Sequence, residues 1–213
     1  MDNKLRLRFS KTGKLRFIGH LDFLRVFQQM IRRSGLPIAY SQGFNPHQII
    51  SFALPLPLGM ESVHDYADIT LTANVPTDEI IKKLNDAAPQ GLTVLAAYHV
   101  QGANAAAATV AADYMISLSP GHCDLQSSIT KILQSETLII PKKTKSGIKN
   151  TDIRPDIFAI EISEDCIKMR LSAGSARFLN PLLVAEQVLQ IVPQAISRME
   201  LYQSDGAGAL KPL

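Results

Sequence analysis

An alternation of apolar and polar residues is the first pattern along the chain. The apolar positions are Leu5, Leu7 and Phe9, and the polar ones between them are Arg6 and Arg8. A period of two residues is typical of a half-buried strand, because successive side chains point to opposite faces of a sheet. We therefore expect a strand over residues 4–9 that packs through one face and carries guanidinium groups on the other.

A helical period replaces this alternation from residue 20 onward. The apolar stripe consists of Leu21, Leu24, Phe27 and Ile31, flanked by Phe23, Val26 and Met30. This spacing predicts an amphipathic helix over residues 20–33. Asp22 near its start complements the helix dipole, and Gly35 is a usual terminator. His20 therefore lies at the beginning of the helix, next to backbone N–H groups that favour an anion.

The remaining pattern repeats one order of elements. The first half adds strands at 37–40, 47–54, 63–72 and 92–100 and a helix at 77–87; the second half has strands at 113–119, 137–142, 156–163, 166–173 and 196–203 and helices at 122–135 and 179–191. Both halves fit the ferredoxin-like order β-α-β-β-α-β. We therefore expect an α+β fold of two tandem ferredoxin-like units, each an antiparallel sheet with helices on one face. These units span residues 1–101 and 113–205, with an alanine-rich linker at 102–112 and a tail at 206–213.

Positive charge is concentrated in two segments. The 213 residues carry a formal net charge of only +3, with 46% hydrophobic and 19% charged residues, as in ordinary globular proteins. Residues 1–33 hold nine Lys and Arg against two Asp, and residues 142–154 hold five against one. The rest of the chain is net acidic, so a polyanion would bind to these two segments and not to the protein as a whole.

Cysteine usage and hydropathy restrict the class of protein. Cys123 and Cys166 form neither a zinc pattern nor an iron–sulfur motif, so we expect two buried thiols, no metal site and no cofactor. No apolar run reaches the roughly 18 residues of a membrane span, and the charged start lacks the apolar region of a signal peptide. These features predict a cytoplasmic protein that does not associate with membranes.

Four short motifs resemble those of a bacterial family, the radical S-adenosylmethionine-linked proteins. They are G-H-L-D (19–22), G-F-N-P (43–46), S-F-A-x-P-L-P-x-G (51–59) and D-I-R-P (152–155). The resemblance is close over residues 8–71 and includes the basic segment 142–157. It implies a domain of unknown function that is often fused to, or encoded beside, a radical S-adenosylmethionine protein. His47 stands where that family commonly has arginine, which weakens a phosphate-binding role at this position.

The two basic segments supply most of the candidate nucleic-acid-binding residues. These candidates are Arg6, Arg8, Lys11, Lys14, Arg16, His20, Arg25, Asn45, Lys142, Lys143, Lys145 and Arg154. Basic side chains would engage phosphates, while Asn45, Phe44 and Tyr40 would contact bases. Together with the implied partner, this set predicts a non-catalytic RNA-binding accessory module that works with a separate radical S-adenosylmethionine enzyme in RNA modification or processing. Two distant cysteines cannot hold the cluster that the radical chemistry requires.

Two alternative functions remain open. The first is a metal-independent endoribonuclease that uses His20 as general acid or base, with Lys14 or Arg16 neutralising the developing phosphorane charge. It needs a second proton-transfer group, which the sequence does not identify. The second is a protein-interaction scaffold that docks the radical enzyme without touching RNA. Simpler interpretations also exist, since basic side chains can line a solvated face and His20 can cap or pack against the helix.

Overall fold

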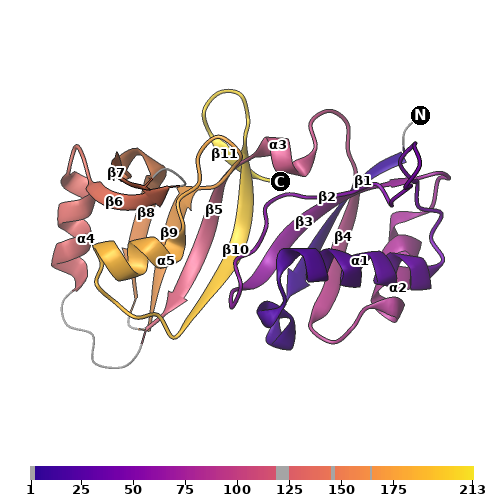
Figure 1. Ribbon diagram of the computed structural model, residues 1–213, viewed down its shortest axis with the longest axis horizontal. Helices are drawn as coiled ribbons and strands as arrows, with labels where there is room; N and C mark the ends of the chain where they lie inside the picture. Colours follow the sequence, from indigo (N-terminus) through magenta and orange to yellow (C-terminus); the bar gives the residue numbers. More distant parts are fainter. Residues whose placement is uncertain (1–2, 119–124, 145–146, 164) are drawn as a thin grey trace.

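One mixed sheet organises most of the protein. The computed structural model describes residues 3–118, 125–144, 147–163 and 165–213 (Figure 1). In the described chain the sheet has nine strands, with the central order β4-β1-β3-β10-β5-β9-β8, while β2 pairs with β3 and β11 with β10. The strands are β1 (Asn3–Lys11), β2 (Ile50–Phe52), β3 (Glu61–Leu71), β4 (Leu92–His99), β5 (Thr109–Ser117), β8 (Ile157–Ile162), β9 (Cys166–Ser172), β10 (Ala195–Ser204) and β11 (Leu210–Pro212).

The expected tandem of two ferredoxin-like units, each with its own antiparallel sheet, is wrong. Strand β10 pairs in parallel with β3 through Ser197 opposite Glu61 and Arg198 opposite Ser62, which joins the strands of both halves into one mixed sheet. The other strand pairs of this sheet are antiparallel. The pairing was missed because element order does not specify which sheet edges meet when the partners are more than 130 residues apart.

Helix content in the second half is also lower than expected. The helix predicted at 179–191 is a short α5 (Pro181–Leu183) followed by a π-helical turn, η3 (Val184–Val188). Wide-turn bonds from Leu189 N to Val184 O and from Ile191 N to Ala185 O, both 3.0 Å, replace the α-helical ladder. With these wider turns all four of these apolar residues are buried, so side-chain packing favours the π-helical turn over the α-helix that the apolar period predicts.

Helices α1 (His20–Ser34) and α2 (Thr77–Ala87) cover one face of β1, β3 and β4 (Figure 1). The predicted limits of the first helix are confirmed, and Gly35 ends it in a left-handed conformation with φ of 68°. The predicted apolar stripe is partly wrong, because Leu21 is 68% exposed. The helix instead buries Phe23, Phe27, Met30 and Ile31 against the sheet. Two neighbouring apolar stripes share one period, so periodicity alone could not choose between them.

The second half contributes most of another hydrophobic cluster, which also includes Ala53, Leu56, Met60 and Tyr66. Helix α4 (Leu125–Gln134) lies against β8, and the hairpin of β6 (Ile139–Thr144) and β7 (Gly147–Asp152) forms a separate two-stranded sheet. The short turn η2 (Arg154–Asp156) leads from β7 into β8. Ile129, Ile132 and Ile140 join a hydrophobic cluster with inward-facing residues of β5, β8 and β9. No helix in the described chain has the length and apolar character needed to cross a membrane.

Several predicted loops and strands differ in detail. The strand expected at 37–40 is reduced to isolated bridges from Ile38 and Tyr40, and the one expected at 47–54 shortens to β2. The alanine-rich stretch holds a short helix, α3 (Ala105–Ala108), and the expected tail contains β11. The proposed division of the chain into two units at this stretch stays a prediction.

Candidate functional site

A buried cluster of charged side chains lies where the two halves of the sheet meet. Lys11 on β1, Asp65 on β3 and Arg198 on β10 are 2%, 3% and 0% exposed. The Arg198 guanidinium donates from Nη2 to Asp65 Oδ2 at 2.6 Å and to the carbonyl of Leu54 at 2.9 Å. The backbone N–H of Tyr66 donates to Asp65 Oδ1 at 2.9 Å. Both carboxylate oxygens of Asp65 are therefore engaged.

The Lys11 ammonium gives this cluster one more cation than carboxylates. Its Nζ donates to the carbonyl of Ile18 at 3.2 Å and lies 4.7 Å from the centre of the Phe23 ring. Burial lowers the pKa of Lys11, the Asp65 charge opposes this shift, and the Arg198 charge adds to it. A cation in a largely apolar setting costs folding free energy unless it is paired, and Asp65 is already paired with Arg198.

Replacing Lys11 with Met is therefore expected to stabilise the fold near neutral pH by about 1–4 kcal/mol, since the Arg198–Asp65 pair remains. The folded-state pKa of Lys11 lies below its usual 10.5, so within that pH interval the unfolded chain binds more protons and wild-type stability rises with pH. The advantage of the variant should shrink as pH approaches 10.5. Urea unfolding across this pH range measures the stability of both proteins, with Lys131→Met at an exposed position of α4 as the control. A variant less stable than the wild type would contradict this account.

A small cavity of about 10 Å³ lies beside this cluster, beneath His20. Its lining consists of Lys11, His20, Phe23, Phe52, Leu54, Leu56 and Asp65. His20 begins α1, is partly exposed, and sets its ring edge-on to Phe52 at 5.6 Å between centroids. A space of this size holds one water-sized group. The site thus combines an imidazole at the rim, an ammonium inside, and mainly apolar walls.

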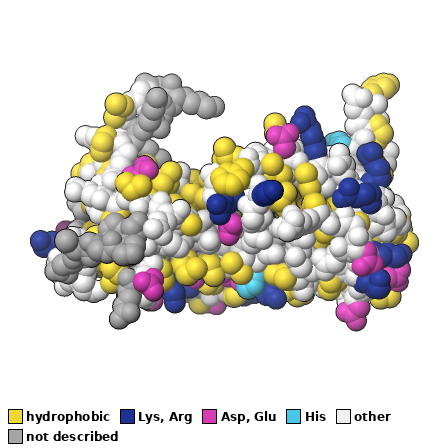
Figure 2. Space-filling model, turned by 90° about the horizontal axis from the view of Figure 1, so that it is seen from below, with side chains coloured by type: hydrophobic (Ala, Val, Ile, Leu, Met, Phe, Trp, Pro, Cys, Tyr) yellow, Lys and Arg dark blue, Asp and Glu magenta, His cyan; other side chains and the backbone are white. Residues whose placement is uncertain are grey.

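An exposed surface of basic and apolar side chains adjoins His20. We call it the η1–α1 surface; it consists of Lys14, Arg16, Phe17, Leu21, Arg25 and Leu58. The turn η1 (Gly13–Phe17) stacks the Arg16 guanidinium 4.7 Å from the centre of the Phe17 ring, which is 61% exposed. The carbonyl of Arg16 accepts from Gly59 N at 2.8 Å, which holds the proline-rich loop beside η1. On the face drawn in Figure 2, basic side chains lie among hydrophobic ones near the middle of the long axis.

Gly91 anchors η1 to the sheet. Its carbonyl accepts from Thr12 N at 2.8 Å, and its φ of 90° lies in the left-handed region. A Cβ at this position would meet the Thr12 carbonyl oxygen at 2.5 Å, so only glycine permits the approach. This backbone contact therefore helps to fix the turn that presents Lys14 and Arg16.

Comparison with known proteins identifies the family. A family model described as "Uncharacterized protein conserved in bacteria (DUF2344)" matches residues 4–181. The chain belongs to this family. Its description names no radical S-adenosylmethionine protein. No curated protein matches the chain. One similar solved structure is that of an unknown protein from Galdieria sulphuraria, which is 12% identical to this chain. The match covers 89% of each chain, but its TM-score is only 0.29, so no argument rests on it.

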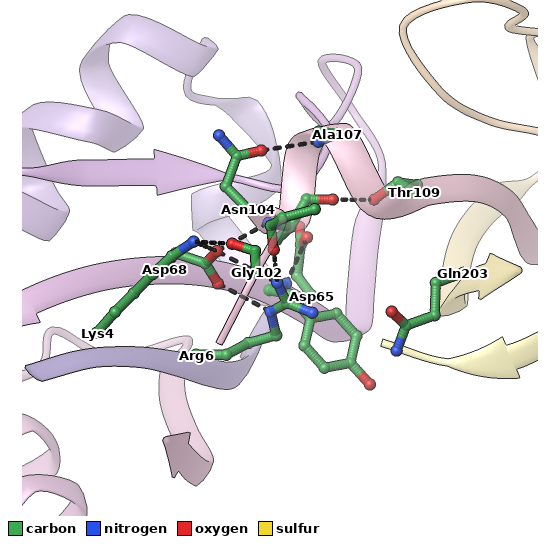
Figure 3. A network of polar contacts seen from close by, with 12 residues as sticks. Lys4, Arg6, Asp65, Asp68, Gly102, Asn104, Ala107, Thr109 and Gln203 are labelled. Atoms are coloured by element: carbon green, nitrogen blue, oxygen red, sulfur yellow. Dashed lines mark hydrogen bonds and ion pairs between the residues drawn. The ribbon is translucent and has the colours of Figure 1, made fainter. Parts of the chain in front are cut away.

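In this DUF2344 protein Arg6 is engaged within the protein (Figure 3). It is 5% exposed and pairs with Asp68 through Nε to Oδ1 at 2.8 Å and Nη2 to Oδ2 at 3.2 Å. Asp68 Oδ2 also accepts from the backbone N–H of Ala105 at 2.8 Å, while the Asn104 side chain caps α3. Arg6 therefore ties β1 and β3 to α3, where we expected a phosphate contact.

Arg154, another predicted contact, also has a structural role. Its guanidinium donates to three backbone carbonyls, those of Ser135 at 3.1 Å, Ile157 at 2.9 Å and Leu133 at 2.7 Å. These bonds fasten the end of α4 to the start of β8. Arg154 thus satisfies carbonyl groups at a helix end, and its hydrogen-bonding capacity is largely occupied.

The remaining predicted residues lie in different settings. Arg25 is exposed and pairs with Asp22 at 2.8 Å, Lys14 is exposed, and Arg8 is partly buried on the sheet face opposite the helices. Asn45 is exposed in the loop between Tyr40 and Gln48, beside a fully exposed Phe44. Lys142 and Lys143 belong to β6, and Lys145 lies outside the described residues. Lys14 and Arg16 thus lie on η1 and His20 and Arg25 on the start of α1, each at least partly exposed, whereas Lys11 is buried and lines the cavity with His20.

Sequence reasoning missed Asp65 and Arg198 as partners. Asp65 does share strand phase with the buried Ala67 and Ile69, which is a usable signal for a buried carboxylate. Arg198 carries no such signal, since it sits among polar and apolar residues of β10. Its partner becomes apparent only when the parallel pairing of β10 with β3 is known.

Proposed function

We propose that this protein is a non-catalytic RNA-binding module that works with a separate radical S-adenosylmethionine enzyme in RNA modification or processing. The observation that carries the RNA-binding part is the η1–α1 surface, where an exposed Phe17 ring lies against Arg16 on the same turn as Lys14. Single-stranded RNA is commonly bound by such a combination, in which aromatic rings stack on bases and cations contact phosphates. The partner rests on the motifs that resemble the radical S-adenosylmethionine-linked proteins.

The chemistry of this surface suits a flexible polyanion. Arg16 and Arg25 pair with Glu61 at 3.1 Å and with Asp22 at 2.8 Å, and all four side chains remain partly or largely exposed. Exposed pairs of this kind contribute little to stability and exchange readily for phosphate contacts. Leu21, 68% exposed, and Leu58, 67% exposed, add apolar area on which bases can pack.

Removing the three cations of this surface tests the proposal. In the variant Lys14→Ala/Arg16→Ala/Arg25→Ala, the slope of log affinity against log salt for a single-stranded RNA should flatten by about 2, because each phosphate contact contributes about 0.7. Phe17→Ala should weaken binding by about 1–3 kcal/mol without changing that slope. The triple variant Lys82→Ala/Lys83→Ala/Lys131→Ala removes the same charge from α2 and α4 and serves as the control.

The outcome distinguishes the proposal from its rivals. Equal slopes for wild type and both triple variants would contradict RNA binding at the η1–α1 surface. A protein scaffold predicts association with the radical enzyme that survives high salt and is unaffected by the triple variant. Crosslinking and sequencing of bound RNA, with and without that enzyme, identifies the RNA.

The cavity beneath His20 favours a second candidate function, a metal-independent ribonuclease. This function needs two proton-transfer groups, and Lys11, whose pKa is lowered by burial, shares the cavity with His20. A parallel assay for strand scission in the salt series tests it. Scission by the wild type that is lost in His20→Ala would support the enzyme, whereas intact RNA would contradict it.

A further inference from the structure

We infer that the cavity beneath His20 binds a phosphoryl group, with one phosphoryl oxygen seated against the Lys11 ammonium. This inference rests on the proposed RNA-binding function and deepens it by naming the part of the ligand that the site takes. It concerns a group that enters from the η1–α1 surface past His20. The cavity itself is about 10 Å³, which is room for one oxygen atom and not for a base or a sugar.

The hydrogen-bonding capacity of Lys11 is the first support. An ammonium has three donors, and among the residues the structure describes the one acceptor bonded to Lys11 Nζ is the carbonyl of Ile18, at 3.2 Å. The walls formed by Phe23, Phe52 and Leu56 offer no side-chain acceptor. Asp65 also lines the cavity, but its two oxygens accept from Arg198 and from Tyr66 N. An anionic oxygen in the cavity would satisfy the donors of Lys11 that remain.

The charge of the cluster is the second support. Lys11 and Arg198 bring two cations to one carboxylate, Asp65, so the buried group carries a net positive charge. Arg198 is fully buried, and its Nε and Nη1 atoms have no hydrogen-bond partner among the described residues. Its bonded partners, Asp65 and Leu54, both line the cavity. Arg198 does not line the cavity itself, so it would act on an anion there through its charge, which is felt more strongly in this low-dielectric setting than it would be at the surface.

The start of α1 completes the rim. Gly19 is the N-cap residue and supplies no side-chain hydrogen bond, so the first N–H groups of this 15-residue helix have no side-chain cap. His20 stands at the same point and is partly exposed. A tetrahedral phosphoryl group can insert one oxygen toward Lys11 while its other oxygens stay at the rim, near the imidazole and the helix N-terminus. A carboxylate would leave only one oxygen for the rim, whereas a phosphoryl group leaves at least two.

Inorganic phosphate is the first probe. We expect a saturable shift of the His20 ring signals when the full-length chain is titrated with phosphate and followed by NMR. In Lys11→Met the affinity should fall by about tenfold or more, because a charge-assisted hydrogen bond is lost. Lys131→Met removes the same charge at a distant exposed position and should change the affinity by less than about twofold, as expected for a screened surface charge. A thermal melt verifies that both variants are folded.

Oligonucleotides with different ends distinguish the source of the phosphoryl group. If an RNA end is bound, an oligonucleotide with a terminal phosphate should bind more tightly than its hydroxyl counterpart, and Lys11→Met should abolish the difference. If an internal phosphodiester is bound, the two oligonucleotides should bind equally and Lys11→Met should weaken both. Either pattern supports the phosphoryl site.

The inference is overturned if phosphate leaves the His20 signals unchanged or shifts them equally in Lys11→Met. RNA binding that is unaffected by Lys11→Met but sensitive to the Lys14/Arg16/Arg25 variant would overturn the phosphoryl site and leave the proposed function standing. Phosphate binding at His20 without RNA binding would overturn the proposed RNA-binding function and leave the phosphoryl site standing.

Discussion

Replacing Asp65 with Asn is expected to lower the free energy of unfolding by about 3–5 kcal/mol. The carboxylate is 3% exposed and receives Arg198 Nη2 at 2.6 Å, while Lys11 lies within its electrostatic reach. The substitution leaves two buried cations with no anion to offset them. Equilibrium unfolding in urea measures the loss, and Asp86→Asn is the control, because Asp86 pairs with Lys82 on the exposed side of α2 and should cost less than about 1 kcal/mol.

A triple variant separates the charge imbalance from simple misfit at this position. Changing Lys11 and Arg198 to Met together with Asp65 to Leu removes all three charges, and most of the lost stability should return. If Asp65→Asn costs no more than Asp86→Asn, the Arg198–Asp65 pair does not hold the two halves of the sheet together. If the triple variant is as unstable as Asp65→Asn alone, then packing and not charge governs the site.

Replacing Phe27 with Ala is expected to lower the free energy of unfolding by about 3–5 kcal/mol, because the ring is fully buried between α1 and the sheet. Its centroid lies 5.3 Å from that of Phe9, 5.2 Å from that of Phe52 and 6.1 Å from that of Phe23. Truncation therefore removes one member of a packed aromatic cluster and leaves a cavity that its rigid neighbours cannot fill.

Leu21→Ala on the same helix is the matched control for Phe27→Ala. Leu21 is 68% exposed, so its truncation should change the free energy of unfolding by less than about 0.5 kcal/mol. Urea unfolding and thermal melts measure both variants. A larger loss for Leu21 than for Phe27 would show that the helix packs through the stripe expected from the sequence and not through the one in the structure.

Local features of the fold could be predicted from the sequence, and long-range ones could not. Helix α1 begins at His20 and ends before Gly35 as expected, because the period, the charges at its ends and the terminating glycine all lie within the segment itself. The parallel contact of β3 with β10 depends on residues that are far apart in the chain, and no local pattern encodes it. The joined sheet, which replaces the two expected sheets, follows from that contact.

The candidate site likewise has local features that could be predicted from the sequence and long-range features that could not. The cations of η1 and the start of α1 were recognised because they are dense in sequence, and Lys14, Arg16 and Arg25 do reach the surface. The phosphate contact predicted for Lys11 stays a prediction, and the burial of Lys11 continues the buried phase of Leu7 and Phe9 along β1. Several walls of the cavity beneath His20 come from distant parts of the chain, namely Phe52, Leu54, Leu56 and Asp65, so the enclosed cavity could not be inferred.

The central place of β10 in the sheet affects how the chain folds during synthesis. Strands β3 and β5, which flank β10, leave the ribosome long before residues 195–204 do, so each exposes an open edge while the intervening chain is made. Asp65 and Lys11 are likewise synthesised before Arg198, which follows Asp65 by more than 130 residues. The junction of the two halves is thus assembled after translation of nearly all the other strands, and until then the facing edges of β3 and β5 are open to edge-to-edge association.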